Sequence, residues 1–498
     1  MTAALILLER GEKMLTEAEI KRFIDDDSNS KKKQLARVGQ RYYEADHDIL
    51  KSRFFFYNAD GKLVEDTTRS NIKICHPFFT ELSDQLSAYI LSFKDNPIRA
   101  KETAEGLQDI LDDYFDDDFY TEIGELITGA YNKGFEYIYA YKNAEGRLSF
   151  QCADSLGVVE VRAKDTDDNC EYYIYWYIDR IDKGKKEIKR IQVWSEKETR
   201  YYTQTNNGEI ALDDSVEINP RPHVVFTDQK TNKKKGYSFG FIPFWRLDNN
   251  KKQISGIKPV KHLIDDYDIM ECGLSNNLAD FDTPLHVVSG FEGDNLEELQ
   301  QNLKTKKIIG VDTEGDVQIR TVDIPYQARK TKADEDEKNI YRFGMGFNSS
   351  QVGDGNITNV VIRSRYTLLD LKASKLERRL KRLLKQLVKV VLDEVNKEKG
   401  TDYNSSDVYF DFVHEIMTNE SENYENEKVK AETQGIIINN ILNAAARLDD
   451  ETVAKAICDA FDINYEDIKD KLPKQEEGTK EAQDILDGVT TEEVVVDE

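Results

Sequence analysis

The residue types that carry acid–base, nucleophilic and metal chemistry are dispersed along this chain. No histidine pair has the H-E-x-x-H spacing of a zinc protease, since His414-Glu415 has no second histidine in place. The chain also lacks G-x-x-x-x-G-K-[ST], the loop that holds phosphates in P-loop ATPases. The six histidines are His47, His76, His223, His262, His286 and His414. Their scatter indicates core or surface side chains, not metal ligands.

Cysteines, glycines and acidic clusters provide no site either. The five cysteines are scattered and odd in number, which predicts free core thiols in a reducing compartment. Gly353-Asp-Gly355 indicates a turn, because no strand–turn–helix unit with a lysine surrounds it. The adjacent acids of Asp116-Asp-Asp118 indicate a solvated turn. We therefore predict that the protein is not an enzyme and needs no metal or cofactor.

Net charge limits the ways in which the protein can meet nucleic acid. The 498 residues carry a formal charge of −26, and the pI is about 4.8. A typical DNA-binding protein neutralises phosphates with a basic surface, whereas this chain as a whole would repel DNA. The apolar run Ala3–Leu8 is too short for a signal peptide or a membrane span. We expect a soluble, intracellular chain without a membrane partner, starting at Met1 or at Met14, which precedes a better helix start.

The first half of the chain predicts helices followed by strands. Thr16-Glu-Ala-Glu19 is a capping box, and further helices are expected at 31–44, after Pro77, at 101–115 and at 119–133. The aromatic patch Phe54–Tyr57 is expected to be a strand or a core segment. From Tyr137 to Trp245, aromatic and β-branched runs separated by turn residues predict an antiparallel β-meander.

The second half predicts two helices that flank a small insert. A helix at 259–281 has an apolar stripe, and Asp265, Asp266, Asp268 and Glu271 are expected to lie off it. The insert has strand patterns at 285–289, 308–311 and 317–321 and a helical one at 296–304. The returning helix, 326–346, is polar on nearly all sides, which is typical of a solvated helix or of one that lines a wet space between subunits.

One very long helix follows a polar loop. Apolar residues recur at alternating steps of four and three, at Leu369, Ala373, Leu376, Leu380, Leu383, Leu387 and Val390. The pattern extends from about 359 to 398 and gives a rod of about 60 Å at 1.5 Å per residue. Such a rod suggests an assembly that must cross a distance. A strand at 407–413, helices at 420–443, 450–461 and 464–471, and an acidic, disordered tail from Pro473 are expected after it.

This order of segments resembles the portal proteins of long-tailed double-stranded DNA phages, the siphophage-type portal family. The similar segments begin with Tyr43-Glu-Ala-Asp-His-Asp-Ile-Leu50 and Gly240-Phe-Ile-Pro-Phe-Trp245. They continue with Leu263-Ile-Asp-Asp-Tyr-Asp-Ile269, Asn339-Ile-Tyr-Arg-Phe343 and Asn356–Arg365. The resemblance covers about residues 40–470. The chain departs from the family where a Ser-Gly-Val-Ala-like step is common, because Thr358-Asn-Val-Val361 stands there and leaves the local bend of the rod open.

The resemblance implies an α+β portal fold with a helical stem and crown, an antiparallel β-rich wing and a small α/β clip, assembled as a ring that is usually a dodecamer. The implied divisions are the wing at 1–255, stem helices at 256–284 and 325–346 and the clip at 285–324. A tunnel loop at 347–358, the long helix at 359–400, a wing strand at 401–416, a crown at 417–472 and the tail at 473–498 complete the chain. The ring would sit at a capsid vertex of the virion after assembly in the host cytoplasm. It would meet sliding double-stranded DNA, terminase, the head–tail adaptor, and the major capsid and scaffolding proteins.

Three groups of residues become candidate sites. The DNA-facing loop residues are Phe347, Asn348, Ser349, Ser350, Gln351, Asn356 and Thr358. The loop has no Lys or Arg, which predicts a steric, polar collar and not an electrostatic clamp. The stem residues that would line the channel are Arg329, Lys330, Lys332, Asp334 and Glu337. A basic stripe on the rod, at Arg378, Arg379, Arg382 and Lys385, is predicted to pair with acids of a neighbouring subunit or the wing, and contact with DNA is the alternative.

Two other functions compete with this one. A packaging nuclease or ATPase would need the P-loop or the carboxylate–metal cluster that the sequence lacks. A capsid, tail or scaffold protein without a DNA channel is the second alternative. The order helix, insert, helix, loop and rod argues against it.

Overall fold

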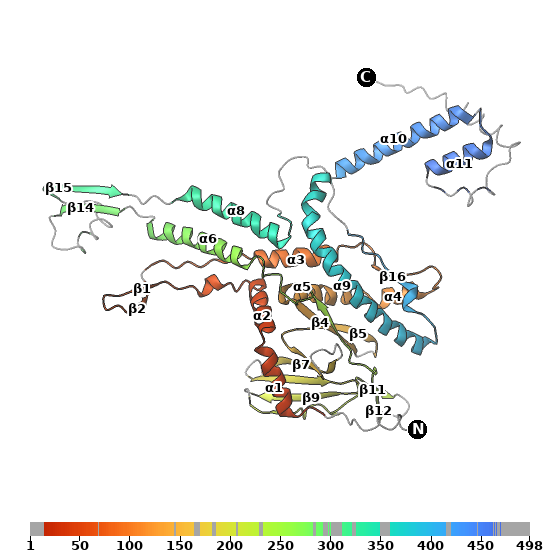
Figure 1. Ribbon diagram of the computed structural model, residues 1–498, viewed down its shortest axis with the longest axis horizontal. Coiled ribbons are helices and arrows are strands. Elements are labelled where there is room, and N and C mark those ends of the chain that lie inside the picture. The colour runs from red at the N-terminus through yellow and green to blue at the C-terminus, as the bar shows by residue number, and fades with distance from the viewer. Residues whose placement is uncertain are drawn as a thin grey trace, which may run out of the picture. The chain divides into compact units, whose positions relative to one another are not determined.

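The computed structural model describes residues 14–469, except 68, 144–145, 164–169, 182–185, 206–207, 229–232, 282–284, 292–296, 298, 300–310, 321–324, 349–358, 415–419, 446, 462, 464 and 466–468. The chain forms two compact units. The first consists of Met1–Gly353 and Arg365–Ile416, and the second of Asp354–Ser364 and Met417–Glu498. Helices and small antiparallel sheets alternate along the chain, as the α+β prediction requires (Figure 1).

The N-terminal segment forms two capped helices and an exposed hairpin. The predicted capping box is confirmed at α1 (Glu17–Ser28), where Thr16 and Glu19 cap each other's backbone. Helix α2 (Lys31–Tyr43) follows, then a 3₁₀ turn η1 (Asp48–Lys51) and the hairpin of β1 (Phe55–Tyr57) and β2 (Leu63–Glu65). The aromatic patch is therefore a strand. Of the two predicted alternatives, a strand or a core segment, the strand is confirmed, and Phe55, Phe56 and Tyr57 are all exposed.

Three further helices form the centre of the first unit. They are α3 (Phe78–Ile90), α4 (Leu107–Tyr114) and α5 (Asp117–Lys133), with the short strand β3 (Ile98–Ala100) between α3 and α4. The helix expected from 101 begins only at Leu107, because Gly106 takes a left-handed conformation with φ of 71° at its N-cap. The predicted helix at 119–133 is confirmed, and Asp116 caps its first turn.

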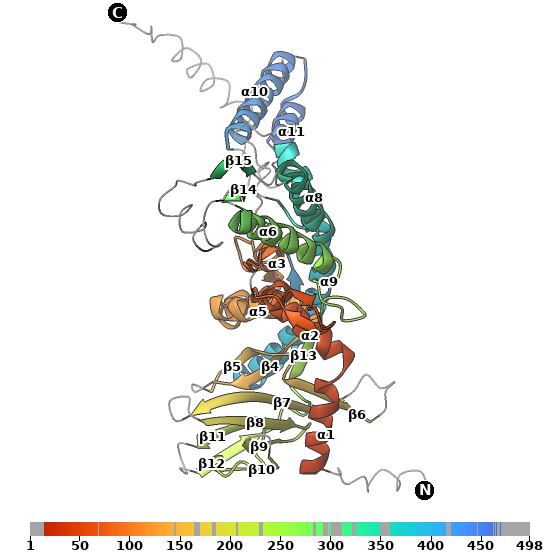
Figure 2. The same ribbon diagram turned by 90° about the vertical axis from the view of Figure 1, so that its left-hand side faces the viewer.

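The β-rich region is an antiparallel meander flanked by two smaller sheets. The meander, in the order β10-β9-β8-β7-β6, consists of β6 (Val158–Arg162), β7 (Cys170–Ile181), β8 (Lys186–Trp194), β9 (Thr199–Thr205) and β10 (Ile210–Leu212). Helix α1 lies against it, and Ile20 and Ile24 join its apolar side chains (Figure 2). A meander extending over all of 137–245 is wrong, because β4 (Phe135–Lys142) pairs with both β5 (Leu148–Ala153) and the distant β13 (Phe244–Asp248). A third sheet joins β11 (Val224–Asp228) to β12 (Lys233–Tyr237).

Two side-by-side helices lead to a β-hairpin and back. Helix α6 (Lys261–Phe281) runs out, and α8 (Tyr326–Gly344) returns beside it (Figure 1). The hairpin is β14 (Leu285–Phe291) and β15 (Val311–Arg320). Of the two strands predicted on this side, 317–321 corresponds to the end of β15, whereas 308–310 of the other lie outside the described residues. Strand β15 begins at Val311, and its pairing with β14 has a register shift between Ser289 and Phe291. The expected helix at 296–304 lies almost wholly outside the described residues.

The long helix is confirmed as α9 (Asn359–Lys399). The predicted leucine stripe, from Leu369 to Leu387, is buried with side chains of α3 and α5 in one core cluster. The strand expected at 407–413 shortens to β16 (Val408–Phe410), which pairs with β3 and follows the 3₁₀ turn η4 (Ser405–Asp407). In the second unit, α10 (Glu420–Ala445) packs on α11 (Asp450–Ala460). The predicted tail lies outside the described residues.

Candidate channel segment

Helices α6 and α8 are bound together by polar contacts that use two of the predicted stem residues. Lys332 Nζ lies 2.6 Å from an Asp266 carboxylate oxygen and also pairs with Asp336 on its own helix. The hydrogen bond that Lys332 donates to Asp266, followed by the one it donates to Asp336, raises the pKa of Lys332 above its usual value. Arg329 donates to the Met270 carbonyl across 3.3 Å. Both cations therefore connect the two helices within one subunit.

The other stem residues behave differently. Lys330 and Asp334 are exposed on α8. Glu337 accepts a hydrogen bond from the Asn348 side chain at 3.0 Å, so the stem helix holds the first polar residue of the predicted loop. Ser349, Ser350, Gln351, Asn356 and Thr358 lie outside the described residues.

An extended segment, residues 70–76, is bound along α6, and we call it the strap. Every second backbone N–H of the strap meets a side chain of every fourth residue of the helix. The bonds join Ser70 to Asp280 at 3.2 Å, Ile72 to Asn276 at 2.6 Å, Ile74 to Cys272 at 3.1 Å and His76 to Asp268 at 2.9 Å. Two extended residues rise about 6.6 Å and four helical residues about 6.0 Å, so the two spacings nearly match. No sequence pattern predicts this ladder.

Asp268 forms the inner end of the ladder. Its carboxylate lies 2.6 Å from His47 Nδ1 and 2.8 Å from His76 Nδ1. Burial alone would raise the pKa of Asp268, but the hydrogen bonds from His47 and His76 hold it below its usual value. Asp268 was expected only to lie off the apolar stripe, and the structure adds that its side chain is fully buried. The two histidines satisfy the charge that the fold buries.

The base of the predicted loop, at Phe347, is held in place by contacts with the rest of the subunit. Gln85 of α3 accepts from the Phe347 N–H at 2.9 Å and donates to its carbonyl at 2.7 Å. The Phe347 ring stacks on Tyr366 of α9, with centroids 4.6 Å apart and planes 8° apart. Any Cβ on Gly346 would lie 2.2 Å from a methyl carbon of Leu82, so only glycine allows this close approach. Phe347 is thus a packed anchor within the subunit.

The stack at Phe347 continues toward the end of the first unit. Tyr366 stacks on Tyr89 at 6.2 Å, and Tyr89 stacks on His414 at 4.6 Å. The Tyr89 hydroxyl donates to Asp370 on α9 at 3.2 Å. Four rings therefore connect the loop base with the segment that follows β16.

Lys372 is a cation inside this junction. Its Nζ donates to the Gly344 carbonyl at 3.1 Å and to the Leu82 carbonyl at 3.3 Å, and it lies 4.7 Å from the Tyr131 ring centroid. Gly344 ends α8, so Lys372 caps that helix. Burial lowers the pKa of Lys372 to about 7. No motif or spacing in the sequence points to Lys372.

The four residues of the predicted basic stripe differ in solvent exposure. Arg378, Arg382 and Lys385 are exposed, whereas Arg379 is half-buried. Among the residues that the structure describes, none of these four forms an ion pair within the chain.

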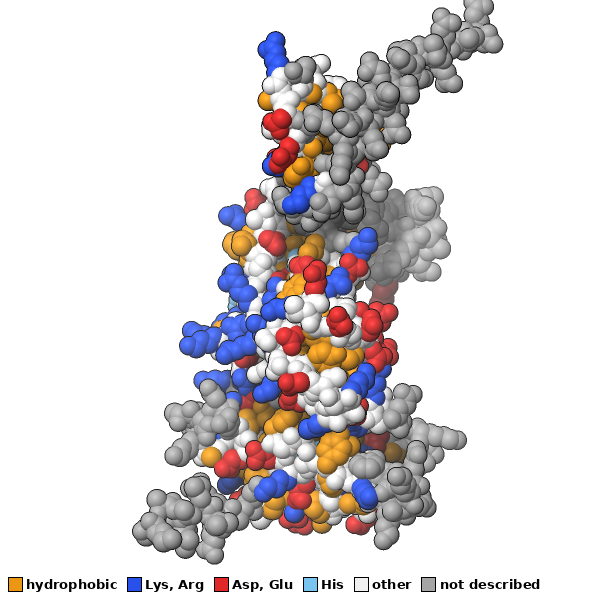
Figure 3. All heavy atoms as spheres, turned by 90° about the vertical axis from the view of Figure 1, so that its right-hand side faces the viewer, with side chains coloured by type: hydrophobic (Ala, Val, Ile, Leu, Met, Phe, Trp, Pro, Cys, Tyr) orange, Lys and Arg blue, Asp and Glu red, His pale blue; other side chains and the backbone are white. Residues whose placement is uncertain are grey.

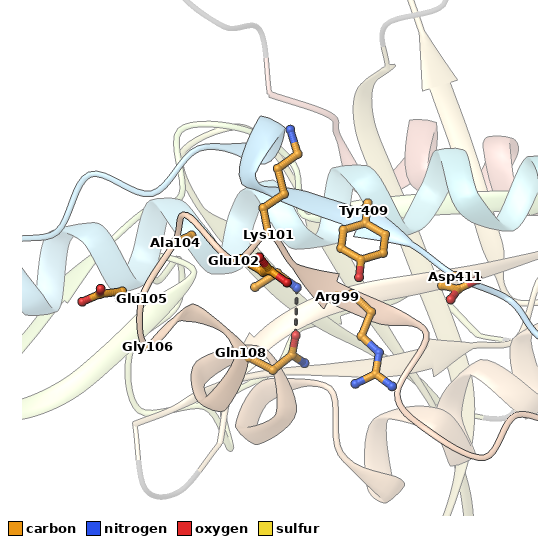
Figure 4. A pocket seen from close by; sticks show the side chains of 10 residues that line it. Arg99, Lys101, Glu102, Ala104, Glu105, Gly106, Gln108, Tyr409 and Asp411 are labelled. Carbon is orange, nitrogen blue, oxygen red and sulfur yellow. Dashed lines mark hydrogen bonds between the residues drawn. The ribbon is translucent and has the colours of Figure 1, made fainter. Parts of the chain in front are cut away.

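A surface pocket is lined mainly by charged and polar side chains (Figure 4). It lies between the turn after β3 and strand β16, and Arg99, Lys101, Glu102, Tyr409 and Asp411 contribute to its wall. The Ala100 N–H donates to Gln108 Oε1 at 2.8 Å beside it. No histidine, serine or cysteine is among the residues that line it.

The described part of the chain contains neither a candidate metal site nor a candidate membrane-spanning helix. There, no cluster of three His, Cys, Asp or Glu side chains could hold a metal ion. No described helix combines the length and the apolar character that crossing a bilayer requires.

Comparison with known proteins finds phage portal proteins among the relatives of this chain. The portal protein of Bacillus phage SPP1 is 25% identical over 387 residues, which cover 77% of this chain and 75% of that protein. The portal protein of Clostridium phage phiCD119 is 23% identical over 437 residues, which cover 83% and 89%. The family model described as "Phage portal protein, SPP1 Gp6-like" matches residues 22–470. The chain therefore belongs to the SPP1 Gp6-like family of phage portal proteins.

Proposed function

We propose that the chain assembles as a ring at one vertex of a phage capsid and that DNA enters and leaves through the ring. The observation that carries this proposal is the junction at Phe347. There the paired helices α6 and α8 lead into a polar loop whose base is fixed by Gln85 and Tyr366. A loop anchored in this way can project into a channel while its base stays in place.

The parts of the subunit then take distinct roles. Helices α6 and α8 are the stem, the β14–β15 hairpin belongs to the clip, and α10 and α11 form the crown. The helices and sheets before α6 form the wing. The clip is the docking site for terminase during packaging and for the head–tail adaptor afterwards. Capsid and scaffolding proteins surround the wing.

The charge balance supports passage of DNA without tight binding. A ring of subunits multiplies the −26 charge of each chain. Each phosphate held by a lysine or arginine would strengthen DNA binding and slow its sliding. The loop from 347 to 358 contains no Lys or Arg, so we propose short polar contacts from Asn348, Gln351 and Asn356.

Electron microscopy of the purified full-length chain tests the assembly. Rings with a central hole support the proposal, whereas shells, tubes or monomers contradict it.

A packaging assay tests the loop. We expect heads built with the triple variant Asn348→Ala, Gln351→Ala, Asn356→Ala, or with Gly353→Pro, to protect clearly less DNA than wild-type heads. The rings themselves should form normally. Normal packaging by both variants would show that the loop has no role in DNA passage.

A further inference from the structure

The outward side of α9 carries a row of cations, which we call the basic face. It consists of Lys375, Arg378, Arg382, Lys385 and Lys389. Alternating steps of three and four place all five on one side of the helix over about 21 Å. Every one of them is exposed, and within the described part of the chain none pairs with a carboxylate. Asp393, four residues after Lys389, is the one acid of the helix spaced three or four residues from any of them, and Glu377 is buried and pairs with His414.

A second surface of the same unit has the opposite charge, and we call it the acidic flank. It consists of exposed acids from the turn before α4 to the first turn of α5, namely Glu105, Asp109, Asp112, Asp113, Asp117 and Asp118. Asp113 meets Arg147 at 3.2 Å in an exposed pair, which is worth little in water. The flank therefore keeps most of its negative charge available for a partner.

The two surfaces belong to different sides of one apolar core. Leucines of α9 and the α5 residues Phe119, Ile123 and Leu126 share a single buried cluster. The basic face is the side of α9 that points away from this cluster. In Figure 3, Lys and Arg side chains gather along one edge of the view, and Asp and Glu gather along the other. A head-to-tail contact in a ring joins two different patches of the same chain, as this arrangement permits.

We infer that the basic face of α9 docks on the acidic flank of a second copy of this chain. The inference rests on the proposed ring and names the contact that closes it. Charge complementarity selects the partner, because subunits of charge −26 repel one another unless their interface places unlike charges together. At the head of the basic face, Leu368 and Leu371 are 37% and 49% exposed. Two leucines in line with the cations suit a protein interface better than a DNA backbone.

Charge reversal on each side tests the pairing. The first variant is Arg378→Glu with Arg382→Glu, and the second is Glu105→Lys with Asp109→Lys. Native mass spectrometry or sedimentation at ~0.1 M salt, where exposed charges interact over about 10 Å, gives the concentration at which half the chains are in rings. We expect each variant alone to raise that concentration by about tenfold or more. A tenfold change corresponds to a loss of about 1.4 kcal/mol in the free energy of each subunit contact.

Rescue separates pairing from misfolding. All four changes in one chain restore the unlike charges, and so does a 1:1 mixture of the two variants, because their subunits can alternate. We expect rings to return in both cases. Lys397→Glu with Lys399→Glu, at the end of the same helix, is the matched control and should assemble like wild type.

Several results would overturn the inference. This contact is excluded if the charge-reversal variants assemble like wild type. It is also excluded if the variants unfold at the wild-type temperature but neither the four-fold variant nor the 1:1 mixture restores rings. Variant rings that form normally but package less DNA would assign the basic face to DNA. Wild-type chains that form no rings would remove the proposed function together with this interface.

Discussion

At the scale of single residues, Lys372 should make the stability of the subunit depend on pH. Its pKa of about 7 lies below the ordinary lysine value of 10.5 because it is buried. Below pH 7 both the folded and the unfolded chain hold the proton, and folding bears the full cost of burying the charge. Between pH 7 and 10.5 the folded state releases the proton first, so stability rises with pH.

Lys372→Met removes this dependence. We expect the free energy of unfolding of wild type, relative to the variant, to increase by ~1–2 kcal/mol from pH 7 to pH 9. Urea unfolding at several pH values measures the difference. The control is Lys375→Met on the exposed face, where the difference from wild type should stay constant. A constant difference for Lys372→Met would show that its ammonium is not desolvated.

Residue roles such as that of Lys372 could not be predicted from the sequence. Its burial depends on the carbonyls of Leu82 and Gly344, which are distant in the chain and come close only in the fold. The burial of Asp268 could not be predicted for the same reason, because an acid on a helix is normally exposed and its histidine partners lie far away in sequence. Thr16 was predictable because a capping box uses residues three apart.

At the scale of elements, the strap should depend on its helix acceptors. Asn276→Ala removes the acceptor of the Ile72 N–H and leaves a partly buried donor unpaired. We expect a loss of about 1–3 kcal/mol in unfolding free energy. Hydrogen exchange of residues 70–76 should also become faster. The neighbouring Asn277→Ala, which removes no bond to the strap, is the control and should leave exchange there unchanged. Equal exchange in both variants would contradict the ladder.

Glycines offer a second comparison between elements. Gly346→Ala places a Cβ 2.2 Å from a buried Leu82 methyl carbon, and we expect it to cost about 1–3 kcal/mol. Gly435→Ala in α10 meets nothing within 4 Å, and it should stabilise that helix by roughly 0.5–1 kcal/mol. Thermal unfolding followed by circular dichroism compares the two. A neutral Gly346→Ala would mean that the turn after α8 can move away from α3.

Elements with strong periodicity were predictable and non-local pairings were not. Helix α9 follows from its leucine spacing, and α6 and α8 follow from their positions around the insert. The division of the β region was missed because β13 returns to β4 from about a hundred residues away. The strap was missed because an extended chain that bonds to side chains has neither the period of a helix nor that of a strand.

At the scale of the whole molecule, the order of elements was predictable and the assembly was not. Residues 22–470 match the portal family, in agreement with the resemblance seen in the sequence. A ring depends on contacts between copies of the chain. The periodicity of the sequence reports the packing within one chain, and it indicates only which residues remain on the surface. The basic face of α9 could be found in the sequence as a run of cations, but its separation from the acidic flank required the fold.

The division into two units predicts that the first unit folds without the second. Its core cluster ends with Phe410 and Phe412 and includes no side chain after residue 416. A chain ending at Ile416 should therefore lose the helical signal of α10 and α11 but unfold within a few degrees of the full-length protein, by circular dichroism.

A chain ending at Gly400 is the control. It lacks β16, which pairs with β3, and His414, which stacks on Tyr89. It also loses the buried Val408. We expect this shorter chain to unfold well below the other two, because strand pairing, ring stacking and apolar burial are lost together. If the two truncated chains unfold at the same temperature, β16 contributes little to the core. If both unfold far below the full-length protein, the two units fold as one.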